Sequence, residues 1–301
     1  MTEGGKHMNT VTMESPKDLP KRKSRMQKIV KEITRKKVTL ISSIFIMILI
    51  IAAIIGPWIT PYNPAAPDYS NILSPPSLAH IFGTDAYGRD IFSRILAGTQ
   101  ISLSVSVSAV LIGAVIGTIL GLVSGFFGKL VDKLIMRVCD VLFAFPDIIL
   151  AIGIVAILGP GLRNVVIAVA FFSVPSFARL VRGTTLEVKE QLFVESARSM
   201  GASRRRIIFK HIFPETLPSI MVYFTMSIGT TILAAASLSF LGLGADPSTP
   251  DWGAMLSTSR DYIGSAFHVV FFPGLIIFLT VLSFNVFGDG LREILDPKLK
   301  D

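Results

Sequence analysis

Side chains that could perform catalysis are few in this chain of 301 residues. Its four histidines, His7, His80, His211 and His268, stand in separate segments, and none belongs to a His-Glu-x-x-His zinc motif. The sequence has no Gly-x-Ser-x-Gly nucleophile motif, so a serine hydrolase is not supported. It also has no Gly-x4-Gly-Lys-Ser/Thr loop, so ATP would have to bind to another chain. We therefore predict a non-enzymatic protein with no metal and no cofactor of its own.

Charged side chains inside apolar segments are the next candidates for functional residues, because a charge in a membrane is energetically costly and marks a functional site by default. Asp147 follows Phe145-Pro146, and proline interrupts a helix, so we predict a half-helix that starts at Asp147. The Asp147 carboxylate either caps that half-helix or faces a substrate, and capping is the favoured interpretation. Asp140 lies close in depth to Arg179 and Arg182, which predicts an ion pair with a structural or gating role.

A glycine-rich motif with paired charges begins at residue 83 and reads Gly-Thr-Asp-Ala-Tyr-Gly-Arg-Asp, followed by Ser93-Arg94. Aspartate and arginine beside glycines predict a compact turn tied by charge-assisted hydrogen bonds, with a helix that starts near the second aspartate. A metal site is a poorer interpretation, because arginine stands among the carboxylates and the EF-hand spacing is missing. The residues predicted to build this turn are Gly83, Asp85, Gly88, Arg89 and Asp90.

The most informative segment runs from Glu187 to Pro218. Apolar residues recur at helical spacing on both sides of Gly201, which predicts a helix, a turn at the glycine and a second helix. Basic residues, among them Arg204–Arg206, would be exposed beside the apolar stripe. Such a helix can bury its stripe in lipid headgroups or in a groove of a partner protein, and the pattern alone supports both.

These candidates must be positioned by a helical membrane scaffold. The chain is 51% hydrophobic and only 17% charged, which leaves too little polar surface for a soluble enzyme. A β-barrel is excluded, because barrel strands alternate over about 10 residues and are never apolar for so long. We predict an all-α membrane protein with six transmembrane helices at about 38–59, 101–125, 138–158, 164–178, 217–242 and 268–288.

The distribution of basic residues predicts the orientation. Of the 29 Lys and Arg residues, 25 fall in the segments 1–37, 126–137, 179–216 and 289–301, so the positive-inside rule places both termini in the cytoplasm. The net charge of +8 thus orients the chain, and nucleic-acid binding is not needed to explain it. The predicted parts are a basic N-terminal segment (1–37) with an interfacial helix from Lys21, a first span (38–59), an external loop (60–100), a core (101–290) that includes the cytoplasmic loop 183–216, and a cytoplasmic tail (291–301).

Two motifs resemble those of ABC importer permeases. The first resembles the EAA loop, whose pattern is Glu-Ala-Ala-x3-Gly-x9-Ile-x-Leu-Pro. In this chain the pattern reads Glu195-Ser196-Ala197, three residues, Gly201, nine residues, and His211-Ile212-Phe213-Pro214. It departs from the family pattern at Ser196, His211 and Phe213. The motif at 83–94 resembles a signature of the dipeptide/oligopeptide/nickel branch, as do Asp251-Trp252-Gly253 and residues 288–292. Gln100 stands where that branch commonly has arginine.

This resemblance implies the C-type permease subunit of a binding-protein-dependent importer in the bacterial inner membrane, with the type I fold and a coupling helix between the fourth and fifth spans. The implied partners are a second homologous permease, two cytoplasmic ATPases that bind ATP and Mg, an external solute-binding protein and membrane lipids. The implied cargo is di- or oligopeptides, with nickel chelates or glutathione-like solutes as alternatives. The implied ATPase-coupling residues are Glu195, Ser196, Ala197, Gly201, Ala202, Arg206 and Pro214.

A self-contained secondary transporter is the alternative from a different class. It predicts an internal repeat and buried charges for ion coupling. The sequence shows no repeat, and the predicted spans contain little charge besides Asp140 and Asp147. Copurification of an ATPase would distinguish the two classes.

Overall fold

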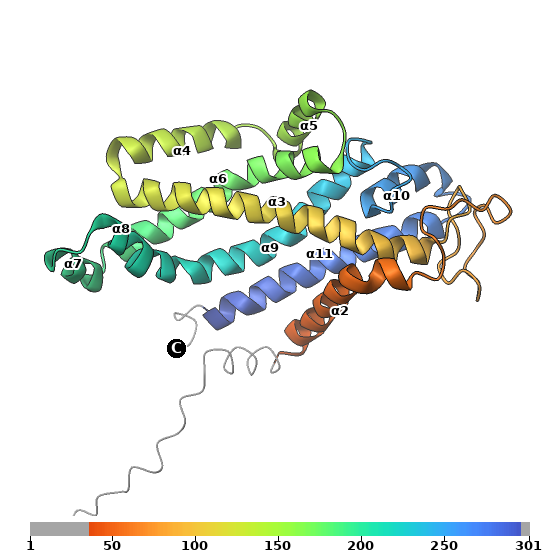
Figure 1. Cartoon of the computed structure of the whole chain (residues 1–301), viewed down its shortest axis with the longest axis horizontal. Coiled ribbons are helices and arrows are strands. Elements are labelled where there is room, and N and C mark those ends of the chain that lie inside the picture. Colours follow the sequence, from red (N-terminus) through yellow and green to blue (C-terminus); the bar gives the residue numbers. More distant parts are fainter. Residues whose placement is uncertain (1–35, 296–301) are drawn as a thin grey trace, which may run out of the picture.

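The computed structural model describes residues 36–295, which form helices and connecting segments with no β-strand among them. The long helices run side by side, with short helices and loops at the two ends of the bundle (Figure 1). Five of them are long and apolar enough to cross a membrane, and there are six such segments if a bent pair of shorter helices is counted as one span. The interfacial helix predicted from Lys21 lies outside the described residues. The long helices are α2 (Lys37–Ile59), α3 (Ile91–Phe127), α6 (Leu162–Lys189), α9 (Phe213–Phe240) and α11 (His268–Leu295).

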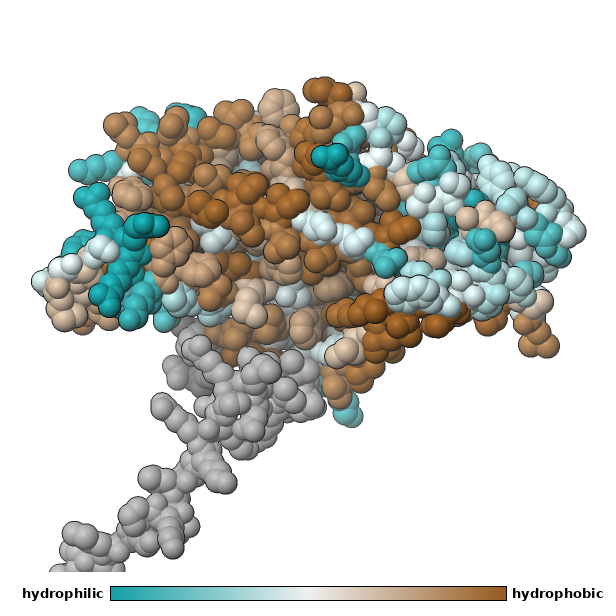
Figure 2. Space-filling model, viewed as in Figure 1, coloured by the Kyte–Doolittle hydropathy of each residue, from teal (hydrophilic) through white to brown (hydrophobic). Residues whose placement is uncertain are grey.

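The surface between the two ends is apolar (Figure 2). On α2, for example, Ile41 is 66% exposed and Ile54 is 58% exposed, although both would be buried in a soluble protein. At one end lie α7 (Leu192–Ser199), α8 (Arg204–Arg206) and the π-helical turn Ile207–Ile212, and we call this the α7 end. At the other lie residues 60–90, α10 (Trp252–Ser259) and the 3-10 turn Arg260–Tyr262, and we call this the loop end. This distribution fits a bundle whose middle is surrounded by hydrocarbon.

A row of glycines packs α3 against α6. Gly113, Gly117, Gly121 and Gly125 recur every four residues, so they share one face of α3. A Cβ atom at Gly117 would lie 2.5 Å from the Cβ of Phe177 and 2.6 Å from the carbonyl oxygen of Val174. Small residues at such positions let helix backbones approach closely in a membrane, where van der Waals packing drives association.

The third predicted span differs most from the structure. A span over about 138–158 with an interruption at Pro146 was expected, and the structure has α4 (Lys129–Phe143), a break, and α5 (Asp147–Leu158), bent by 90° relative to α4. The predicted interruption at Pro146 is thus confirmed, whereas the predicted start at residue 138 is wrong. Helix α4 starts earlier because Leu130, Val131 and Leu134 continue its apolar face, with charged residues on the other side.

Other helices extend beyond their predicted limits. Helix α3 begins directly after Asp90, as the motif predicted, and not at residue 101. Helix α6 continues to Lys189 rather than ending at residue 178, so much of the predicted loop 183–216 is helical and continuous with α6 or α9. Helix α11 ends beside the start of α2, where Lys36 and Glu293 form an ion pair.

Candidate functional site

The segment around Gly201 folds as a short helix, a tight turn and a second helical segment. Helix α7 ends in a left-handed residue, Gly201, with φ of +79°. The Ala202 N–H donates to the Ala197 carbonyl, and the Gly201 N–H donates to the Arg198 carbonyl, each at 3.0 Å. This pair of hydrogen bonds is the Schellman motif, which satisfies carbonyls at the C-terminus of a helix. The predicted helix–glycine–helix arrangement is confirmed.

Helix α7 has two apolar sides rather than the single stripe that the sequence suggested. Val194 and Ala197 are buried against the rest of the chain, whereas Leu192 and Met200 are both 81% exposed. Ala197 therefore does not lie on the outer surface, and its small side chain lets α7 pack onto its own protein. Glu195 and Ser196 are exposed on the outer side, and the Ser196 hydroxyl donates to the Leu192 carbonyl at 2.8 Å.

The second helical segment continues into a long membrane helix without a break. Ser203 caps α8 by accepting a hydrogen bond from the Arg206 N–H at 3.4 Å. Ile207 and Ile212 anchor the following π-helical turn in the core, and Pro214, which has no backbone N–H to donate, is the second residue of α9, directly after that turn. Arg204, Arg205 and Arg206 are exposed. The exposed arginines are thus connected to α9 by a continuous helix, and α7 is connected to α6 by the short link 190–191.

At the loop end, the glycine-rich motif forms the predicted tied turn. The Asp85 carboxylate accepts hydrogen bonds from the backbone N–H of Tyr87 and Arg89 and from the Arg89 Nε, the last at 2.7 Å. Asp90 caps α3 by accepting from the Ser93 N–H at 2.8 Å. Asp85, Arg89 and Asp90 are each at least 94% buried. Gly88 has φ of +73°, and a Cβ there would overlap the Asp68 carbonyl.

The motif also holds a segment distant in sequence, which the sequence did not reveal. Arg89 donates through Nη1 to the Pro247 carbonyl at 3.1 Å, and fully buried Arg94 donates to carbonyls of Pro64, Pro247, Ser248 and Thr249. Next to these carbonyls, the hydroxyl and N–H of Ser248 donate to Asp246 and hold the pKa of that carboxyl below its ordinary value.

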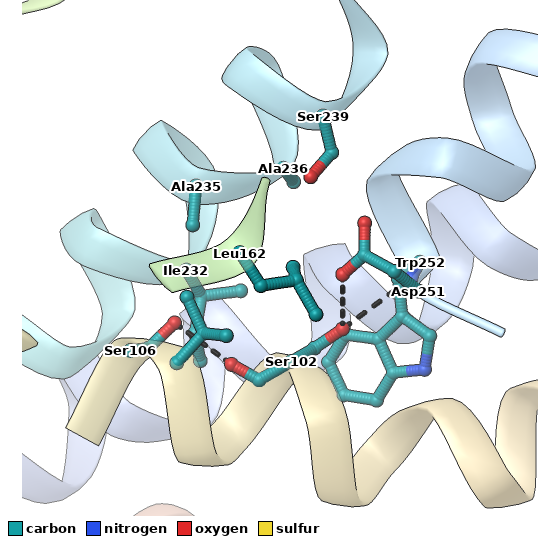
Figure 3. Close-up of a pocket in the computed structure, with 10 residues that line it drawn as sticks. Ser102, Ser106, Leu162, Ile232, Ala235, Ala236, Ser239, Asp251 and Trp252 are labelled. Carbon is teal, nitrogen blue, oxygen red and sulfur yellow. Dashed lines mark hydrogen bonds between the residues drawn. The ribbon is translucent and has the colours of Figure 1, made fainter. Parts of the chain in front are cut away.

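Asp251 and Trp252 attach the loop end to the bundle by hydrogen bonds and packing (Figure 3). Their side chains line a small cavity together with residues of α3 and α9. The Ser102 hydroxyl donates to Asp251 at 3.0 Å, and Asp251 caps α10 through the Ala254 N–H. Trp252 is fully buried and donates its indole N–H to the Ile95 carbonyl at 3.2 Å. We interpret this cavity as part of the packing between α10 and the bundle and not as a ligand site, because the polar groups of Ser102, Asp251 and Trp252 already form hydrogen bonds with one another.

A larger cavity of about 370 Å³ lies between α5, α6 and α9 and has a different character. Asp147 lines it as the first residue of α5, and its side chain makes no capping hydrogen bond. Asp147 thus stands in the first turn of α5, as the capping interpretation requires, but it forms no capping hydrogen bond and lines the cavity. Most of the remaining lining is hydroxyl-bearing or aromatic: Phe172, Ser173, Ser176, Phe177, Tyr223, Ser227, Thr230, Thr231 and Ser237.

Two ion pairs join α4 to α6. Arg179 donates to Asp140 at 2.9 Å, as expected, and its guanidinium also lies 4.4 Å from the ring centroid of Phe143. Arg182 does not contact Asp140 but forms two hydrogen bonds with Asp132, at 2.5 and 2.7 Å. The sequence missed Asp132 because the third span was predicted to start after it.

Comparison with known proteins gives a consistent picture. Residues 117–301 match the family described as binding-protein-dependent transport system inner membrane component, and residues 24–76 match the N-terminal transmembrane domain of oligopeptide transport permease C. The chain is 58% identical over 267 residues to glutathione transport system permease proteins GsiD of Shigella flexneri, Escherichia coli O157:H7 and Salmonella typhimurium. Each match covers 88% of this chain and 88% of the relative.

The fold is also similar to solved structures. A chain of the MetNI methionine ABC transporter in an inward-facing conformation is 21% identical, with a TM-score of 0.58, and the match covers 68% of this chain and 98% of the other. A chain of an amino acid ABC transporter is 18% identical with a TM-score of 0.51 and covers 67% of this chain and 94% of the other. At these identities the likeness concerns the fold alone.

Proposed function

This chain belongs to the family of inner-membrane components of binding-protein-dependent transport systems, and on that basis we propose that it forms half of the membrane pathway for a glutathione-like peptide. It is a permease subunit of an ABC importer of the peptide and glutathione branch. The observation that carries the choice of cargo is the 58% identity to permeases named for glutathione transport, extending over 88% of both chains. Di- and oligopeptides, the first expectation from the sequence, are the wider class to which that cargo belongs.

The proposed division of labour assigns ATP chemistry to partner chains. ATP and Mg would bind two cytoplasmic ATPase subunits, a second permease would complete the pathway, and an external binding protein would deliver the solute. This proposal is supported by the lack of a Walker A motif in the sequence and by the exposed surface at the α7 end. The orientation follows from the positive-inside rule, with the α7 end and both termini in the cytoplasm.

The coupling role is proposed for the outer surface of α7 and α8. Leu192 and Met200 present apolar surface there beside Glu195, and Arg204–Arg206 add positive charge. An exposed amphipathic helix of this kind fits a groove in a partner. Gly201, Ala202 and Pro214 would hold this surface in place, since they build the turn and the junction with α9.

At the loop end, we propose a structural role for Gly83, Asp85, Gly88, Arg89 and Asp90. Their contacts with residues 247–249 would hold a stable surface for the binding protein or the second permease. For Asp140 and Arg179 we propose a gate contact, because the pair is half exposed and joins the bent α4–α5 pair to α6.

The proposed function is tested by uptake in proteoliposomes that contain the complete importer. In vesicles whose ATPase subunits face the lumen, we expect labelled glutathione to accumulate in the lumen. This accumulation should require ATP in the lumen and the binding protein outside the vesicle. An ATPase variant unable to hydrolyse ATP is the matched control. Glutathione uptake that persists in this control would assign the chain to another class of transporter, and no uptake of glutathione by the active complex would refute the proposed cargo.

A further inference from the structure

The cavity between α5, α6 and α9 carries a single charge. Asp147 is the one charged residue among those that line it, and the other polar groups are hydroxyls. The Asp147 carboxylate makes no hydrogen bond or ion pair with any other residue of 36–295. A carboxylate without a protein partner in a membrane-spanning region is costly, so its presence calls for a partner from outside the chain.

The hydroxyls around Asp147 are oriented as acceptors. Ser173 donates its hydroxyl proton to the Val169 carbonyl at 2.8 Å, and Ser237 donates to the Leu233 carbonyl at 2.7 Å. Thr230 likewise donates to the Ser227 carbonyl at 3.1 Å. A hydroxyl has one proton to donate and two lone pairs that accept, so these three oxygens offer lone pairs to the cavity. A ligand group with several N–H donors and a positive charge fits this lining.

The local fold holds Asp147 at this place. Pro146 precedes α5 and fixes the backbone angle at which that helix begins, and α5 is bent by 90° relative to α4. The N-terminus of α5 also favours the ionised carboxylate through the helix dipole, although no side-chain cap forms. No cationic side chain is among the residues that line the cavity with Asp147.

We propose that Asp147 binds the ammonium group of the transported peptide inside the membrane pathway. The carboxylate forms a charge-assisted hydrogen bond with the ammonium, and the hydroxyl oxygens of Ser237 and Thr230 accept further N–H groups as the peptide passes. A volume of about 370 Å³ lies within the range of about 300–1,000 Å³ that is typical of small-molecule sites. The proposal rests on the proposed function and adds to it that the permease itself prefers solutes with a free ammonium group.

The test measures binding to the permease directly. The complete permease–ATPase complex, in nanodiscs and without its binding protein, is examined by saturation-transfer NMR, which detects weak ligands. The probes are glutathione and N-acetylglutathione, which differ in the ammonium group. The variants are Asp147→Asn, which removes the charge, and Asp147→Glu, which keeps it. Asp261→Asn is the matched control, because Asp261 is 81% exposed at the loop end and outside the cavity.

We expect the wild-type complex to bind glutathione about tenfold better than N-acetylglutathione, the effect of one charge-assisted hydrogen bond. The preference should be lost in Asp147→Asn and kept in Asp147→Glu and in the control. Equal binding of both probes by the wild-type complex, or no binding of glutathione, would overturn the proposal without any variant being needed. A preference that survives in Asp147→Asn would overturn it as well. The proposed function is judged separately, by ATP-dependent uptake through the wild-type importer.

Discussion

Gly201 offers the sharpest test of the coupling role proposed for the outer surface of α7 and α8, because at this residue the strain of the backbone can be separated from steric crowding. Its φ of +79° lies in the left-handed region, yet a Cβ built there would meet no atom within 4 Å. A substitution at this position therefore costs energy through the backbone alone. We expect Gly201→Val to uncouple ATP hydrolysis from transport and Gly201→Asn to be tolerated, since asparagine adopts the left-handed conformation more readily than other residues.

The magnitude follows from the turn. A β-branched residue held in the left-handed region costs about 2 kcal/mol. The alternative is to open the turn, which gives up the hydrogen bonds from Ala202 to Ala197 and from Gly201 to Arg198, worth about 1 kcal/mol each. Either route costs about 2 kcal/mol, which corresponds to roughly a thirtyfold change in the equilibrium between the formed and the opened turn.

The assay is binding-protein-stimulated ATPase activity and uptake in the reconstituted complex, with ATPase binding measured by copurification. We expect Gly201→Val to lower uptake per ATP by about tenfold or more and Gly201→Asn to stay within about twofold of wild type. Solute binding by the isolated binding protein should not change. Equal losses in both variants would show that the glycine is needed for something other than its φ angle, and normal coupling in Gly201→Val would show that the turn is not part of the coupling contact.

Three further predictions concern stability and orientation. Arg89→Ala should destabilise the protein by about 3 kcal/mol and lower the thermal midpoint of the detergent-solubilised complex, because it breaks a buried ion pair; an unchanged midpoint would contradict the structural role. Gly117→Ala should destabilise the protein by about 1–2 kcal/mol, because the added methyl group overpacks against α6. Gly153→Ala should be neutral or slightly stabilising, because a Cβ at Gly153 meets no atom within 4 Å. The thermal midpoint of Gly117→Ala should therefore be the lower of the two. A single cysteine at Leu78 should react with an impermeant reagent added to intact cells, and one at Leu192 should not; the opposite labelling would reverse the proposed orientation.

The sequence was informative wherever the signal was local. The length of the apolar segments predicted the bundle, Pro146 predicted the break between α4 and α5, and the residues around Gly201 predicted the turn that the Schellman hydrogen bonds confirm. Asp90 predicted the start of α3, which its cap confirms. Each of these features depends on residues only a few positions apart.

The features that the sequence did not reveal depend on distant contacts. Arg94 binds carbonyls at 247–249, and a carbonyl has no side-chain signature that a sequence pattern could show. The burial of Ala197 could not be foreseen, since an apolar residue on a short helix can face either its own protein or a partner. Asp147 could not be assigned to the cavity because the 90° bend, which sets its position, is a tertiary property.

The central claim is that this chain is moved by an ATPase that binds the outer surface of α7. The most direct measurement is photo-crosslinking from Leu192→Cys, labelled with a benzophenone in a Cys139→Ala background and coexpressed with the partner subunits. Leu192 is 81% exposed on that surface, and a label at Leu78, at the loop end, is the control. We predict a crosslink from residue 192 to the ATPase subunit and none from residue 78. A label at residue 192 that reacts only with lipid would contradict the account.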